Sequence, residues 1–269
     1  SAFSNCSQLH QFYLPMNSPI QVIEKETFSL SAIQSIFIPL HVIKICEGAF
    51  YSCIKLVNVY IQDRSELQTI EKEAFAYCIE LHHIHFPSDC QLKKNCKNSF
   101  EYSAIRSISF PPNLTQIDEY AFYYCKYLQI IEFQPNSNLQ IIGKGAFQSS
   151  SIENIFIPAS VTQIGEKAFY GCYDIKSFEI SPDSNLQIFE KDIFSNSSIE
   201  SITISSSHIE IKEGWCAGTQ NLTNIMVMEN NPYFKLYDNK FLLKKSSVEK
   251  ENYDILVISR RDIETAIIP

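Results

Sequence analysis

The stretch "IGEKAFYGC", which runs from Ile164 to Cys172, returns in altered form at several places along the chain. Its variants include "ICEGAFYSC", ending at Cys53, "IEKEAFAYC", ending at Cys78, and "IDEYAFYYC", ending at Cys125. Each variant keeps a phenylalanine three residues before the cysteine and an alanine directly before that phenylalanine. A motif that recurs at regular intervals is typical of a repeat protein, so we use the phenylalanine as the marker of each repeat.

The marker phenylalanine recurs through most of the chain, and a cysteine replaces the last one: Phe3, Phe28, Phe50, Phe75, Phe100, Phe122, Phe147, Phe169, Phe194 and Cys216. The interval between markers is either short, as from Phe28 to Phe50, or three residues longer, as from Phe50 to Phe75. The residue three positions after the marker is cysteine before a long interval and serine before a short one. A period of about 20 to 29 residues with aliphatic residues at fixed offsets indicates a leucine-rich-repeat solenoid.

Every repeat carries the same order of structural signals. A short β-prone run such as "IENIFI", at 152–157, has apolar residues at its first, fourth and sixth positions. A turn rich in Pro, Asn and Ser follows, then "VTQI", at 161–164, and then the marker motif, in which we expect a helical or 3₁₀ turn. No repeat buries its apolar face alone, so the repeats must stack. We therefore predict an α/β repeat solenoid, a right-handed superhelix with a parallel β-sheet on the concave face and short helical turns on the convex face.

The stretch "IFIPASVTQIGEKAFYGCYDIKSFEI", at 155–180, resembles the BspA-like class of leucine-rich repeats. The resemblance extends from residue 1 to about residue 227, and the alternation of short and long repeats is most similar to the protist members of that class. It implies a surface protein of the kind found in bacteria and protist parasites, where members are implicated in attachment to host proteins and cells. It implies no particular ligand.

The pattern divides the chain into three parts. Residues 1–227 hold about ten leucine-rich repeats. In 228–262 the marker is missing, and "DNKFLLKKSSVEKENYDILVIS", at 238–259, places two apolar runs around a polar turn, which favours a β-hairpin inserted in a repeat. A long flexible loop is the alternative. Residues 263–269 match the start of a further, truncated repeat, and because neither end carries a polar capping repeat we interpret the chain as an interior fragment.

Composition and motifs argue against several classes of function. The formal net charge is −8, whereas nucleic-acid binding requires a concentrated basic face, so we predict no nucleic-acid partner. No apolar run reaches the length of about 18 residues that crosses a bilayer. A phosphate loop, a G-x-S-x-G elbow and an H-E-x-x-H motif are all missing from the sequence. We therefore predict that the protein is not an enzyme, has no catalytic residues and uses no cofactor.

The clearest candidate metal ligands are the histidines of "LHHIHF", at 81–86. In a strand His83 and His85 point to one side and His82 to the other, so two imidazoles are able to share a zinc ion if a third ligand is present. The alternative is that both are exposed polar residues, since the apolar residues of the run occupy the inward positions. No carboxylate or thiol is positioned as the third ligand, so we predict no metal site.

The chain has nine cysteines, and five of them stand three residues after a marker: Cys6, Cys53, Cys78, Cys125 and Cys172. Serine or threonine takes this position in other repeats, and small residues that replace one another in this way are typical of a packed interior turn. Disulfides are the alternative, either Cys53 with Cys78 in adjacent repeats or Cys90 with Cys96 in one loop. A mass measurement with and without reducing agent separates the two roles.

Four N-glycosylation sequons occur, at Asn5, Asn113, Asn196 and Asn221. They are compatible with secretion, although a chain rich in Asn, Ser and Thr also contains several sequons by chance.

The repeat pattern also predicts which residues a partner would contact. Side chains alternate between the two faces of a strand, and the concave surface of a solenoid is the one generally used for binding. On that surface Tyr13, Phe37 and Tyr60 form an aromatic stripe that continues into His85, and protein interfaces favour such residues. The alternative is that the rings pack against one another across strands. The ligand-binding candidates are Tyr13, Phe37, Tyr60, His83, His85, Glu132, Phe156 and Glu179.

These observations predict a cell-surface module for adhesion or protein recognition, which binds host cell-surface, matrix or other partner proteins through its concave face. The extracellular location follows from the resemblance alone, because we expect any signal and anchor to lie outside this fragment. An intracellular or structural scaffold that assembles proteins without an adhesive role is the alternative. The uncapped ends also predict self-association.

Overall fold

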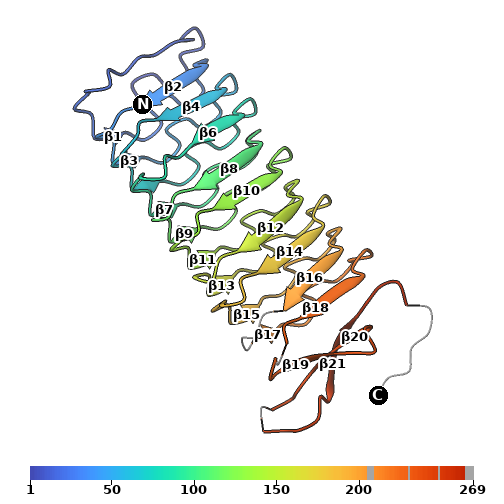
Figure 1. Ribbon diagram of the computed structural model, residues 1–269. Coiled ribbons are helices and arrows are strands. Elements are labelled where there is room, and N and C mark those ends of the chain that lie inside the picture. The colour runs from blue at the N-terminus through green and yellow to red at the C-terminus, as the bar shows by residue number, and fades with distance from the viewer. Residues whose placement is uncertain (205–208, 230, 248, 264–269) are drawn as a thin grey trace.

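The computed structural model describes residues 1–204, 209–229, 231–247 and 249–263 of the chain. Figure 1 shows an elongated solenoid with short strands along one side and longer strands along another. The short strands have two residues each and form one parallel sheet: β1 (Val22–Ile23), β3 (Lys44–Ile45), β5 (Thr69–Ile70), β7 (Lys94–Asn95), β9 (Gln116–Ile117), β11 (Ile141–Ile142), β13 (Gln163–Ile164), β15 (Ile188–Phe189) and β17 (Glu210–Ile211). The register pairs Ile45 with Ile23 of the preceding repeat and with Ile70 of the following repeat.

The longer strands form three parallel sheets that follow one another along the solenoid (Figure 1). The first holds β2 (Ser35–Ile38), β4 (Asn58–Ile61) and β6 (His83–His85), and the second holds β8 (Ser107–Phe110) and β10 (Ile130–Phe133). The third holds β12 (Asn154–Ile157), β14 (Ser177–Ile180), β16 (Ser201–Ile204) and β18 (Asn224–Val227). We call the outward surface of these nine strands the long-strand face.

The marker phenylalanines form a continuous stack in the core. Ring centroids of successive markers from Phe3 to Phe194 are 4.9 to 5.6 Å apart, and their planes differ by no more than 13°. All of them from Phe28 onward are buried. Each aromatic contact adds about 0.5 to 1.5 kcal/mol beyond the burial of apolar area, so the stack ties every repeat to its neighbours. The marker phenylalanine therefore fills the core of each repeat from Phe28 to Phe194.

The predicted helical turns on the convex face are wrong, because the described ranges contain no helix. Successive backbone amides of the marker segment instead alternate between two kinds of hydrogen bond, one to the next repeat and one within the segment itself. Phe50 N donates to the carbonyl oxygen of Ala74 in the next repeat at 2.8 Å, whereas Tyr51 N donates to the carbonyl oxygen of Gly48 at 3.0 Å. The residues two before and two after the marker have positive φ, as at Gly48 (59°) and Ser52 (51°). Such left-handed residues interrupt the right-handed conformation and the four-residue bonding that an α-helix requires.

It follows that no helix in the described part of the chain is long and apolar enough to cross a membrane.

An antiparallel sheet stands at the C-terminal end of the solenoid (Figure 1). It consists of β19 (Phe234–Tyr237), β20 (Phe241–Lys244) and β21 (Ile255–Ser259), and we call it the C-terminal arm. The two apolar runs noted in the sequence are β20 and β21. Phe234, Leu242 and Ile258 join the hydrophobic core of the repeats, so the arm packs onto the last repeat. Of the truncated repeat predicted at 263–269, all but Ile263 lies outside the described residues.

Candidate functional site

Side chains on the long-strand face alternate as the pleat of a strand requires. In β4, Val59 and Ile61 are buried, whereas Tyr60 is exposed. The parallel register aligns Tyr60 with Phe37 on β2 and with His85 on β6. The predicted outward row therefore exists on the first of the three sheets.

Tyr13, Phe37 and Tyr60 lie at the N-terminal end of this face, and we call them the aromatic patch. Tyr13 is 79% exposed, Tyr60 is 55% exposed and Phe37 is half-buried. The Tyr13 hydroxyl donates to Gln11 Oε1 at 2.9 Å. In the described part of the chain none of the three rings contacts another aromatic ring, so mutual packing does not account for them. Their apolar surface faces solvent.

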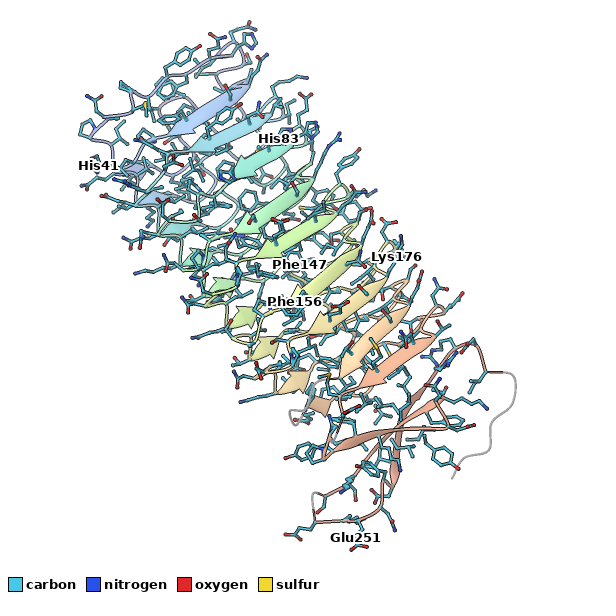
Figure 2. All side chains as sticks on the ribbon, in the orientation of Figure 1. His41, His83, Phe147, Phe156, Lys176 and Glu251 are labelled. Carbon is cyan, nitrogen blue, oxygen red and sulfur yellow. The ribbon has the colours of Figure 1, made fainter. Side chains whose placement is uncertain are left out.

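Glu132, Phe156 and Glu179 occupy the same outward row on β10, β12 and β14, and we call them the acid–aromatic row. Phe156 is paired with Glu179 in the register and is 52% exposed. Figure 2 labels Phe156 among the outward side chains of the long strands. Both carboxylates are exposed, and neither forms an ion pair or hydrogen bond with any side chain that the structure describes.

The three histidines of β6 are divided as the sequence predicts. His83 and His85 are exposed on the long-strand face, while the half-buried His82 places Nδ1 3.3 Å from the carbonyl oxygen of Ala104. Across the described ranges, no group of three His, Cys, Asp or Glu side chains is arranged to hold a metal ion.

A pocket of about 700 Å³ lies where the long-strand face meets the C-terminal arm. Thr203, Met226 and Met228 line it from the repeats, and Leu236 and Asn239 line it from the arm. Sequence reasoning missed this pocket, because it depends on how the arm packs against β18, which no local pattern encodes.

Four of the five cysteines that follow a marker are buried and donate to backbone carbonyls, namely Cys53, Cys78, Cys125 and Cys172, whereas Cys6 is half-buried. Cys53 Sγ donates to the carbonyl oxygen of Phe28 at 2.9 Å, and Cys172 Sγ donates to that of Phe147 at 3.2 Å. Ser150, the serine that takes this position in one repeat, donates to the same Phe147 oxygen at 2.7 Å. Cysteine and serine replace one another because each is small and carries one hydrogen for this acceptor. Burial raises the pKa of the Cys53 and Cys172 thiols to about 11.

All nine cysteines, each within the described ranges, are free thiols, so neither suggested disulfide is formed. Cys90 and Cys96 do not share a loop: Cys90 is buried in the turn after β6, and Cys96 directly follows β7. Cys90 Sγ lies 3.8 Å from the carbonyl oxygen of Leu67. Burial raises the pKa of both thiols, which keeps them protonated and unreactive.

The four sequons differ in accessibility. Asn5 and Asn221 are exposed. Asn196 is exposed too, but its Nδ2 donates to the Tyr170 hydroxyl at 2.8 Å, and Asn113 Nδ2 donates to the carbonyl oxygen of Cys90 at 3.2 Å. A glycan replaces one Nδ2 hydrogen, so Asn5 and Asn221, which are exposed and form no such bond to a described residue, are the more accessible acceptors.

A tyrosine cluster beside the marker turns escaped the sequence reasoning. It runs through neighbouring repeats from Tyr51 to Tyr77, with ring centroids 5.5 Å apart, and on to Tyr102, 5.1 Å farther. Tyr124 follows at 4.7 Å, with Lys126 Nζ 4.5 Å from its ring centroid. The signal was present as tyrosines one or two residues after successive markers. Tyr77 and Tyr102 are stacked, whereas Tyr51 meets Tyr77 edge to face and Tyr124 is tilted against Tyr102, so we interpret the cluster as packing between repeats.

These repeats match the model of one protein family. The BspA type leucine rich repeat region matches in six copies, over residues 1–96 and 93–223. The chain belongs to the BspA-type leucine-rich-repeat family. No curated protein matches it.

Two solved structures share the fold. A leucine rich cell surface protein of Faecalibacterium prausnitzii is 22% identical, with a TM-score of 0.57, over 81% of this chain and 67% of that one. The pneumococcal vaccine antigen PcpA is 23% identical, with a TM-score of 0.53, over 79% of this chain and 44% of that one. At this identity the likeness concerns the fold.

Proposed function

We propose that this chain is a cell-surface recognition module that binds partner proteins, including host cell-surface or matrix proteins, through its long-strand face. Leucine-rich-repeat proteins of this family are generally recognition modules without enzymatic activity, which supports a protein partner. The observation that carries the proposal is the aromatic patch. Exposed tyrosine and phenylalanine side chains with no ring partner are the residues that protein interfaces bury in their centres.

The test removes the patch and measures attachment. A Phe37→Ala, Tyr60→Ala double variant and the unaltered protein are compared for binding to immobilised matrix proteins and to intact cells. We expect the double variant to lose at least about tenfold in affinity, since central aromatic residues carry much of the binding energy. The melting temperature should stay nearly unchanged, because Tyr60 is exposed and Phe37 is only half-buried.

The matched control is a Tyr127→Ala, Tyr173→Ala double variant. These tyrosines are 58% and 69% exposed and precede long strands rather than lying on them. We expect the control to bind like the unaltered protein. Equal binding by the Phe37 and Tyr60 variant would remove the long-strand face from consideration.

A second experiment addresses location. Cells that express the full-length protein are treated with a membrane-impermeant biotin reagent, and labelling of the protein is expected. If it stays unlabelled while its partner binding still depends on Phe37 and Tyr60, the intracellular scaffold is the correct function.

Self-association is a separate proposal. An apolar pocket of about 350 Å³ at the N-terminal end is lined by Phe3, Phe12, Leu14, Val22 and Phe28, among others. Sedimentation over a range of protein concentrations is expected to show dimers that Phe12→Asp abolishes.

A further inference from the structure

We infer that the acid–aromatic row binds an arginine side chain that an extended segment of the partner protein presents. This inference rests on the proposed function, because it describes the chemistry of the partner that the long-strand face binds.

The geometry of the row gives one ring between two carboxylates. Glu132, Phe156 and Glu179 lie on three neighbouring long strands, β10, β12 and β14, as Figure 1 shows. β12 and β14 are hydrogen-bonded neighbours, whereas β10 belongs to another sheet. The sheet of short strands is continuous through these repeats and spaces them about 4.8 Å apart, so the strands that carry the two carboxylates stand roughly 10 Å apart with the strand of Phe156 between them. A flat cation that rests on this ring has a carboxylate on each side.

None of the three side chains is used inside the protein. Phe156 contacts no aromatic ring, and Glu132 and Glu179 have no cationic partner among the described residues. Of the residues that directly precede these three strands, Glu153 and Lys176 are charged and Gln129 is neutral. Three carboxylates and one cation leave a local excess of two negative charges. The face therefore complements a cation, in agreement with the charge of −8 of the whole chain.

Arginine fits this surface better than lysine does. The guanidinium group is planar, stacks on aromatic rings and donates to carboxylates with two parallel hydrogen bonds, whereas an ammonium group is a compact and strongly hydrated charge. Ile130, on β10, is 54% exposed on the same face and offers apolar surface to the aliphatic stem of the arginine.

The distance to the aromatic patch sets the spacing within the partner segment. Tyr60 on β4 and Phe156 on β12 are four repeats apart, and the continuous sheet of short strands spaces successive repeats by about 4.8 Å, which gives roughly 19 Å. An extended segment rises about 3.3 Å per residue, so about six residues cover the distance. The partner segment then carries an aromatic or aliphatic residue on the patch and an arginine about six residues away.

The test titrates the 269-residue chain, labelled with ¹⁵N, with N-acetyl-arginine amide. N-acetyl-citrulline amide, which has the same shape without the charge, is the matched probe. We expect saturable shifts of the Phe156 and Glu179 amide signals with arginine, weaker shifts at high salt and none with citrulline. A Glu132→Gln, Glu179→Gln variant should bind arginine at least about fivefold more weakly.

The matched control is Glu24→Gln, Glu213→Gln, which removes two exposed carboxylates from outside the long-strand face and should change nothing. Equal shifts with citrulline, or unaltered arginine binding by the Glu132 and Glu179 variant, would overturn the inference. Partner attachment that needs Phe37 and Tyr60 but survives Glu132→Lys with Glu179→Lys would also overturn it, and would leave the proposed function standing.

Discussion

The Sγ of Cys125 donates to the carbonyl oxygen of Phe100, a marker in the preceding repeat, at 3.1 Å. Ser103 Oγ lies 3.4 Å from the same sulfur. The side chain after one marker thus satisfies the backbone of its neighbour, and the repeats are joined by polar contacts as well as by the phenylalanine stack.

This contact predicts that the hydrogen-bond donor of residue 125 stabilises the protein more than its sulfur atom does. Cys125→Val keeps an apolar side chain but removes the thiol donor, while Ser103 N still donates to the Phe100 oxygen at 3.0 Å, so we expect a loss of about 0.5 to 1.5 kcal/mol in the free energy of unfolding. Cys125→Ser keeps a donor and should lose less. Urea unfolding followed by circular dichroism measures both. A Val variant as stable as the Ser variant would show that the hydrogen bond contributes nothing.

The stability should fall in alkaline solution because of the same thiol. Burial raises the pKa of Cys125 from 9.0 to about 12. The contribution of this thiol to the free energy of unfolding is complete below pH 9 and is lost as the pH rises toward 12. Between these pH values only the unfolded state releases the thiol proton. Between pH 9 and 10.5 the loss amounts to about 2 kcal/mol. In urea unfolding, Cys125→Ser should lose less free energy of unfolding between these two pH values than the unaltered protein does. Equal losses in the two proteins would contradict the raised pKa of Cys125.

The phenylalanine stack should be intolerant of truncation. Phe122 lies between Phe100 and Phe147, with ring centroids 5.2 and 5.4 Å away, and is fully buried. Phe122→Ala leaves a cavity and should cost about 3 to 5 kcal/mol in urea unfolding. Tyr127→Ala, at an exposed position, should change the stability by less than about 0.5 kcal/mol. Similar effects of the two variants would mean that the stack is not the main contact between repeats.

Asn95 is a weak point in the sheet of short strands. It is buried, it pairs with Ile70 and Ile117, and its Nδ2 has no hydrogen-bond partner in the described part of the chain. Ser99 Oγ donates to Asn95 Oδ1. Asn95→Ile together with Ser99→Ala removes the buried polar atoms, so we expect stabilisation by about 1 to 3 kcal/mol and a higher melting temperature.

Asn95→Ile alone is the control, and it should gain less because Ser99 then lacks its acceptor. A fall in stability of the double variant would contradict the prediction.

The thiols should all be reduced. Unfolding in a denaturant without reducing agent, in the presence of iodoacetamide, is expected to attach nine carbamidomethyl groups. A mass that corresponds to seven would reveal a disulfide. In the folded protein the buried thiols should react slowly, because their raised pKa leaves little thiolate.

The sequence by itself determined the repeat, its inward and outward residues and its buried marker. Those features depend on side-chain alternation and on the need of each repeat to bury an apolar face, and both are visible as spacing. The same alternation placed Tyr60, Phe156 and Glu179 on the outer face correctly.

The tertiary structure alone decided three things. The marker turn is not helical, because the amides of Phe50 and its counterparts bond to the next repeat rather than along their own segment. The arm packs onto the last repeat, and so creates the pocket at Met226 and Leu236. Asn95 lies between Ile70 and Ile117, and its Nδ2 finds no hydrogen-bond partner among the described residues. Each depends on contacts between residues of different repeats, far apart in the chain, which local pattern and propensity do not specify.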